Sequence, residues 1–117
     1  MFWTLSQVAL GGAIGSVLRY LTVAAFGAPW AVAAVNVVGS FAMGVLFVAL
    51  TSRAQISPFL MTGVLGGFTT FSAFSLDALR LWQSGQTLQA ALYIALSVGL
   101  SLFAVALGAA LAKGALT

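Results

Sequence analysis

The stretch GGFTTFSAFS, residues 66–75, lies within an apolar run that is long enough to cross a membrane. It holds two glycines, two adjacent threonines and two serines, and glycine inside a helix costs about 1 kcal/mol relative to alanine. Non-helical backbone at membrane depth is tolerated only where protein buries it or where it lines an aqueous cavity. Two interpretations stay open: a continuous helix whose glycines serve packing, or a helix broken near 66–70 whose freed carbonyl and amide groups bind ions.

The composition of the whole chain predicts an integral membrane protein. Of 117 residues, 62% are hydrophobic and 4% are charged, a balance that no soluble domain of this size could keep in solution. The chain has no cysteine and no histidine, which excludes thiolate chemistry and removes the commonest general base, so an enzyme is not expected. The basic residues form no cluster, which argues against nucleic acid as a partner. We expect one domain, residues 1–117.

The apolar runs predict an all-α membrane protein with four transmembrane helices. Each run is close to the length of about 20 residues that a bilayer requires, and the first is interpreted as a retained helix, not as a signal peptide. Glycine and proline mark the connection after the first run, and Pro58 suits the first turn of the third. The expected spans are 2–26, 30–50, 58–82 and 88–112.

Basic residues are divided evenly between the two ends of these spans. Arg53 and Lys113 lie on one side, and Arg19 and Arg80 lie toward the other. Orientation in a membrane follows the bias of lysine and arginine in short connections, so the chain carries no strong orientation signal. Either a weak bias still selects one orientation, or the chain inserts both ways and pairs as an antiparallel dimer. The even count favours this dual topology.

Three pairs of small residues have the spacing that lets helices approach closely. The pairs are Gly11 with Gly15, Gly63 with Gly67, and Ser40 with Gly44. Such pairs serve contacts within one chain or between chains, and packing within the chain is the favoured interpretation.

Polar and aromatic side chains at membrane depth indicate either packing or an ion pathway. Asn36 stands in an apolar run, where a carboxamide joins helices or lines a pathway. Phe71 and Phe74 share one helix face, with Ser72 and Ser75 beside them. The positive edge of a phenylalanine ring can face an anion without binding it strongly, although core packing is the commoner use of such a pair.

The fourth span carries a line of hydroxyl groups. Tyr93, Ser97 and Ser101 recur every four residues, which places them on one helix face. A serine can also hydrogen-bond within its own helix, so the regular spacing is more informative than any single member. Hydroxyls in series form a ladder of uncharged donors.

Three charged residues fall within the expected spans. Arg19 either attracts anions or anchors its helix. Asp77 and Arg80 are three residues apart and are expected to neutralise each other. Neutral donors are frequent at membrane depth and acidic groups are rare, whereas a cation pathway usually contains carboxylates. The inventory therefore favours an anion.

Several segments together resemble one family, the Fluc fluoride channels of bacteria. They are GGAIGSVLRY at 11–20, VNVVGSFAMG at 35–44, GGFTTFSAFSLD at 66–77 and the hydroxyl series of the fourth span. The resemblance covers essentially the whole chain, and TTFS-x-FS is its most specific part. It implies an antiparallel, dual-topology homodimer in the bacterial inner membrane, with two fluoride pathways and a structural sodium ion in the dimer interface.

The resemblance also implies roles for individual residues. Gly66 and Thr69 would supply backbone carbonyls to the sodium ion. Ala31-Val32 and Ala73 stand where the family usually has glycine-threonine and threonine, and Asp77 stands where glutamate is common. The residues implied for the fluoride pathway are Arg19, Asn36, Phe71, Ser72, Phe74, Ser75, Tyr93, Ser97 and Ser101.

These observations predict a passive, fluoride-selective channel that exports fluoride from the cytoplasm. One alternative is a membrane protein that transports nothing and packs against a larger complex. A second is a small multidrug transporter, which shares the size and the span count. That mechanism needs an acidic residue in the first span, and residues 3–26 contain none.

Overall fold

The structure is a computed structural model that describes residues 1–116, and within that range it is helical without strands. Four stretches are long and apolar enough to cross a membrane, which confirms the predicted number of spans: Phe2–Phe26, Trp30–Ala49, Pro58–Gln83 and Thr87–Leu116. The third stretch comprises three elements. In chain order the elements are α1 (Phe2–Phe26), α2 (Trp30–Ala49), the π-helix η1 (Pro58–Leu65), α3 (Gly66–Phe68), α4 (Phe71–Gln83) and α5 (Thr87–Leu116).

The helix boundaries follow the expected signals, with one difference. α1 ends at Gly27, whose φ of 88° suits glycine, and Pro58 occupies the first turn of η1. The fourth helix was expected to end at 112, but α5 continues to Leu116. Gly114 follows Lys113 and is a common signal for a helix end, but the helix continues through it.

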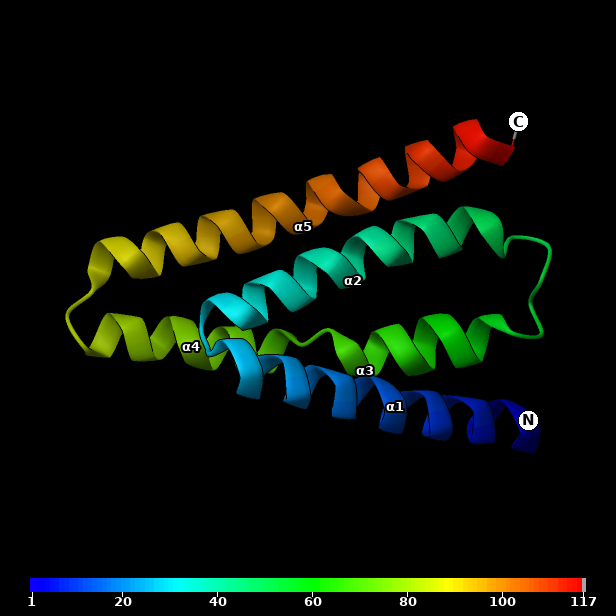
Figure 1. Cartoon of the computed structure of the whole chain (residues 1–117), viewed down its shortest axis with the longest axis horizontal. Coiled ribbons are helices and arrows are strands. Elements are labelled where there is room, and N and C mark those ends of the chain that lie inside the picture. The colour runs from blue at the N-terminus through cyan, green and yellow to red at the C-terminus, as the bar shows by residue number, and fades with distance from the viewer. Residues whose placement is uncertain (117) are drawn as a thin grey trace.

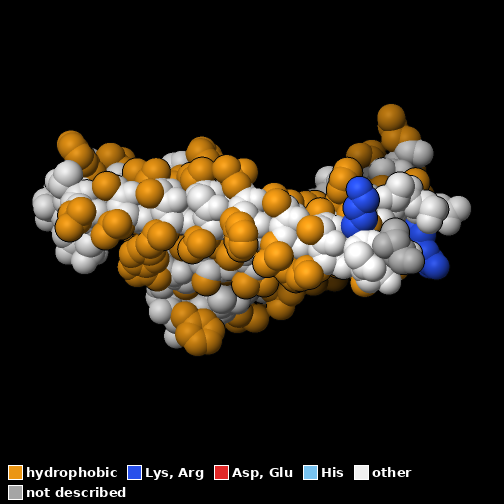
Figure 2. Space-filling view, turned by 90° about the horizontal axis from the view of Figure 1, so that it is seen from above, with side chains coloured by type: hydrophobic (Ala, Val, Ile, Leu, Met, Phe, Trp, Pro, Cys, Tyr) orange, Lys and Arg blue, Asp and Glu red, His pale blue; other side chains and the backbone are white. Residues whose placement is uncertain are grey.

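The helices form two adjacent pairs (Figure 1). α5 lies along α2, and α1 lies along the third stretch, mainly against η1 and α3. Both chain ends and the connection between α2 and η1 lie at one end of the bundle. The molecule measures 48 × 33 × 23 Å, enough to cross a hydrocarbon layer of about 30 Å. Apolar side chains cover most of the face in Figure 2, and Lys or Arg side chains are visible only toward one end.

Glycines allow the backbones of both pairs to touch. A Cβ atom on Gly15 would overlap the Val64 carbonyl and the Phe68 amide of the third stretch. A Cβ atom on Gly44 would likewise overlap the Val105 carbonyl of α5. The small-residue pairs therefore serve packing within the chain, as the favoured interpretation predicted.

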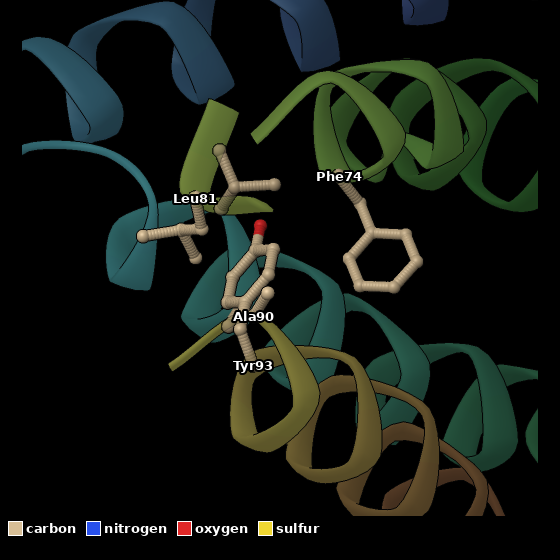
Figure 3. Packing of buried hydrophobic residues seen from close by; sticks show 6 residues of the cluster. Phe74, Leu81, Ala90 and Tyr93 are labelled. Atoms are coloured by element: carbon tan, nitrogen blue, oxygen red, sulfur yellow. The ribbon is translucent and has the colours of Figure 1, made fainter. Parts of the chain in front are cut away.

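A small apolar core joins α2, α4 and α5. Tyr93 is completely buried there, packed with Phe74, Leu81 and Ala90 (Figure 3). The Trp30 and Tyr93 rings form a T-shaped pair with a centroid distance of 5.4 Å and an interplanar angle of 89°, a favourable arrangement for aromatic rings. This core fixes the positions of α2, α4 and α5, which carry most of the predicted site residues.

Candidate functional site

The helical backbone of the third stretch stops at Phe68 and resumes at Phe71. Thr69 (φ −83°, ψ 156°) and Thr70 (φ −153°, ψ 126°) are extended. Gly66 is helical, with φ −63° and ψ −35°, and Gly67 packs against Gly12 of α1. The irregular backbone therefore occupies the two threonines, whereas Gly67 permits the close contact with α1.

Four side chains bond to the backbone around this interruption, and one of them is Thr69, whose hydroxyl donates to the Leu65 carbonyl at 3.0 Å. Asn36 on α2 pairs with Thr70 twice: its Nδ2 donates to the Thr70 carbonyl at 2.9 Å, and its Oδ1 accepts from the Thr70 amide at 2.7 Å. The Thr70 hydroxyl accepts from the Ala73 amide at 3.2 Å and so caps α4. Arg19 on α1 donates from Nε to the Gly67 carbonyl at 3.1 Å. Side chains therefore replace several hydrogen bonds that a continuous helix would make.

These bonds leave two carbonyl oxygens without their helical donors. In an α-helix each amide donates to the carbonyl four residues earlier, so Thr70 would donate to Gly66 and Ala73 to Thr69. Here both amides are engaged by side chains, and no other donor among residues 1–116 bonds to either carbonyl. Unwound backbone carbonyls in membrane proteins coordinate sodium. The free carbonyl oxygens of Gly66 and Thr69 thus fit the sodium ion that the resemblance implies.

A pocket of about 370 Å³ lies beside the interruption. Among the described residues its lining carries no charged side chain, and it combines polar groups of α2 and α5 with two phenylalanines of α4. Ser97 is 5% exposed, and its hydroxyl has no hydrogen-bond partner. That hydroxyl is free to bond with an occupant of the pocket. The lining residues are Asn36, Gly39, Ser40, Met43, Thr69, Thr70, Phe71, Phe74, Ser97, Val98, Ser101, Leu102 and Val105.

Phe71 and Phe74 are in contact, as their spacing predicted. Their ring centroids are 5.5 Å apart, and the rings are tilted by 50°. Phe74 is buried and also packs on Tyr93 at 5.3 Å, whereas Phe71 is 76% exposed. One ring of the pair is thus fixed by the core, and the other lies at the surface of the chain.

Four of the predicted pathway residues lie outside the pocket of this chain, and one of them is Arg19. Tyr93 shares a face of α5 with Ser97 but is buried behind Phe74. Ser75 is exposed and donates to the Phe71 carbonyl of its own helix at 2.9 Å. Ser72 is also exposed, with its hydroxyl 3.3 Å from that of Thr70. The pocket brings together five predicted residues: Asn36, Phe71, Phe74, Ser97 and Ser101.

Charged residues make contacts that differ from the sequence expectation. Asp77 is buried and accepts a hydrogen bond from the Tyr93 hydroxyl at 3.4 Å. Arg80 is exposed, and the described residues contain no ion pair between it and Asp77. The hydrogen-bond partner of the buried Asp77 carboxylate is thus the Tyr93 hydroxyl and not the exposed Arg80 side chain, which lies three residues further along the same helix. Arg19 is not among the pocket residues, and it anchors α1 to the interruption.

Thr70 is the site residue that the sequence reasoning did not assign. It caps α4, lines the pocket and pairs with Asn36. A signal for it was available, since threonine immediately before a helical run is a common N-cap. The pairing with Asn36 joins residues 34 positions apart and has no local signal.

Comparison with known proteins gives consistent results. The family described as CrcB-like protein, Camphor Resistance (CrcB), matches residues 6–109. A protein of Cereibacter sphaeroides (strain ATCC 17029 / ATH 2.4.9) is 54% identical over 121 aligned positions, which cover 97% of this chain and 98% of that protein. A protein of Ruegeria sp. (strain TM1040) is 52% identical over 126 positions, covering 100% of both chains. Both are named fluoride-specific ion channel FluC, a name that describes a channel and no enzyme.

Proposed function

This chain belongs to the CrcB-like family, and on that premise we propose that it is a fluoride-selective ion channel of the membrane. The relatives named above as fluoride-specific ion channels support the choice of ion. The observation that carries the proposal is the uncharged pocket that joins Asn36, Ser97, Ser101 and the two phenylalanines. The four long apolar helices support a multi-pass membrane protein.

The pocket chemistry suits a small, strongly hydrated anion. Fluoride accepts strong hydrogen bonds, so a pathway for it must replace water with donors and still release the ion. The unpartnered Ser97 hydroxyl is one such donor. One N–H of Asn36 donates to Thr70, and the second remains for the pocket because a carboxamide carries two. Phenylalanine edges add weak attraction. A lysine or arginine ring would hold the ion too tightly.

Export of fluoride requires no coupled energy source in this proposal. A negative interior favours outward movement of an anion by about 2.3 kcal/mol per 100 mV. Passive conduction would then remove fluoride that enters the cell as neutral HF. We place the channel in the bacterial inner membrane, with no nucleotide site and no proton coupling.

The assembly that we propose is an antiparallel homodimer with two pathways. A single chain exposes many large apolar side chains, including Phe71 beside the pocket, and a second copy would cover part of that surface. In such a dimer Ser72 and Ser75, which are exposed on α4, and Tyr93 would complete the pathway, with Arg19 near its entrance.

A structural sodium ion belongs to the same proposal. The Gly66 and Thr69 carbonyls, freed from helical bonds, would hold it. Two chains would supply four oxygens, which suit a hard cation. When bound, the ion would offset part of the repulsion between two nearby anions. Liposomes without sodium are expected to show a weakened dimer and reduced flux.

The test is fluoride release from liposomes that contain purified protein, measured with a fluoride electrode. Rapid release is expected, and chloride-loaded liposomes should show none. Phe71→Ile is expected to abolish release, because it removes the ring edge beside the pocket. Phe103→Ile is the matched control, since Phe103 is 63% exposed and lies outside the pocket. Absence of release from a well-folded dimer would reject the channel and favour a helper that transports nothing.

A further inference from the structure

We propose that Asn36 and Thr70 are positioning residues for the cation site: their side chains take the two amides that would otherwise bond to the Gly66 and Thr69 carbonyls. This inference rests on the sodium ion of the proposed function and goes beyond it. The carbonyls are free because two named side chains keep them free, and not because the backbone is irregular. Without the Asn36 and Thr70 side chains, the amides of Thr70 and Ala73 could form helical hydrogen bonds with the Gly66 and Thr69 carbonyls.

The Asn36 contacts carry the first half of the inference. Its carboxamide matches both polar groups of Thr70, with distances of 2.9 Å to the carbonyl and 2.7 Å from the amide. Such a two-point contact fixes Thr70 in its extended conformation, with φ −153° and ψ 126°. The Thr70 amide, which a continuous helix would give to Gly66, therefore points at α2. The Gly66 oxygen is left for another partner.

The Thr70 hydroxyl carries the second half. It accepts from the Ala73 amide at 3.2 Å, the group that would otherwise reach the Thr69 carbonyl. The intervening Gly67 carbonyl is already bonded to Arg19 at 3.1 Å. Arg19 thus satisfies the Gly67 carbonyl, whereas Asn36 and Thr70 leave the Gly66 and Thr69 carbonyls available; the Phe68 carbonyl also lacks its helical donor. Groups that orient metal ligands from behind commonly change metal affinity by about 10–100-fold when they are lost.

Asn36 also lines the pocket, so one side chain touches both the candidate anion pathway and the backbone of the cation site. Loss of flux alone would not separate these roles. The decisive readout is the binding of sodium, followed as the rise in Tm of the purified, full-length protein when sodium replaces a large organic cation in the buffer. A ligand that binds only the folded state stabilises it by RT ln(1 + [L]/Kd), so tighter binding gives the same rise in Tm at a lower ligand concentration.

Four variants test the inference. Asn36→Ala and Thr70→Val remove the two side-chain groups that hold these amides, and each is expected to need about tenfold more sodium for the same rise in Tm. Thr70→Ser keeps the hydroxyl and should retain the wild-type sodium response. Ser40→Ala is the control on the pocket side, since Ser40 lies one turn from Asn36 on α2 and lines the same pocket. It should also retain the wild-type response. If Asn36→Ala fails to fold, the comparison of Thr70→Val with Thr70→Ser still tests the inference.

Each outcome bears on a different statement. A wild-type sodium response in both Asn36→Ala and Thr70→Val would overturn the inference and leave the proposed function intact. No sodium response in the wild type would overturn the inference together with the cation of the proposed function. Fluoride release, measured on the same preparations, tests the channel separately. A response that is weakened in Thr70→Val and restored in Thr70→Ser is the expected result.

Discussion

The two helix pairs of this chain satisfy their backbone hydrogen bonds in different ways. α2 and α5 are continuous helices, and each satisfies its backbone through its own hydrogen bonds. The stretch beside α1 is interrupted at Thr69 and Thr70, and Arg19, Asn36 and Thr70 bond to its backbone there. Both pairs rely on glycine for close contact. The difference is that the interrupted pair presents, away from its helix ends, backbone carbonyls at Gly66 and Thr69 whose helical donors are engaged by side chains.

The two pairs therefore contribute different kinds of groups to the candidate site. Unpaired backbone groups in hydrocarbon cost several kcal/mol each, so an interruption persists only where side chains or a ligand compensate for it. The continuous pair contributes Asn36, Ser97 and Ser101 from rigid helices, and the interrupted pair contributes backbone. The candidate site lies where the two pairs meet.

The largest expected effect tests the close contacts that both pairs share. Gly15→Ala should cost more than about 3 kcal/mol or prevent folding, because its Cβ would overlap backbone atoms of the third stretch. Gly44→Ala should do the same at the contact with α5. Gly12→Ala and Gly99→Ala are controls with nothing near the added atom. Thermal unfolding in detergent measures the effect, and equal stability of Gly15→Ala and Gly12→Ala would contradict it.

A second effect should appear in the interrupted pair alone. Arg19→Ala removes the hydrogen bond to the Gly67 carbonyl and should lower the free energy of unfolding by about 1.5–3 kcal/mol, the range for bonds to charged groups. Arg80→Ala changes an exposed arginine and should alter it by less than about 0.5 kcal/mol. Equal losses in the two variants would show that the contact at Gly67 stabilises nothing.

A third effect concerns the continuous pair and should change flux without changing stability. Ser97→Ala removes a hydroxyl that has no partner, so the free energy of unfolding should change by less than about 0.5 kcal/mol. Fluoride release should fall about tenfold, equivalent to about 1.4 kcal/mol. Ser6→Ala on α1, whose hydroxyl bonds within its own helix, serves as control. Unchanged release in Ser97→Ala would remove Ser97 from the pathway.

The smallest expected effect tests whether the fluoride pathway extends beyond the pocket to Ser75. Ser75 donates only to its own helix in this chain, so Ser75→Ala should leave stability within about 0.5 kcal/mol of the wild type. If the dimer places Ser75 on the pathway, release should drop about threefold, or about 0.7 kcal/mol. Release equal to that of the wild type would restrict the pathway to the residues that line the pocket.

Much of the fold could be predicted because it depends on local pattern. Apolar run length and punctuation gave the four spans, and the spacing of Phe71 and Phe74 gave their contact. The π-helical form of η1 was not predicted, because no residue type marks it. The spacing indicated that Asp77 and Arg80 are neighbours, but it did not indicate that Asp77 is buried and hydrogen-bonded to Tyr93 of another helix.

The candidate site could be predicted only in part. The place of Asn36 in an apolar run and the spacing of Ser97 with Tyr93 and Ser101 indicated functional or structural polar groups, and the structure brings Asn36 and Ser97 to one pocket. The bonds from Asn36 to Thr70 and from Arg19 to Gly67 connect residues 34 and 48 positions apart. Such contacts arise from the way the two helix pairs meet, and the sequence of either pair alone does not contain them.

The position of both chain ends at one end of the bundle (Figure 1) sets a rule for protein engineering. In an antiparallel pair, the C-terminus of one copy and the N-terminus of the other lie on opposite sides of the bilayer. A soluble linker therefore cannot join two copies in that arrangement. A single-chain version needs a fifth, inserted helix of about 20 apolar residues between the copies, whereas a direct fusion would force both copies to face the same way.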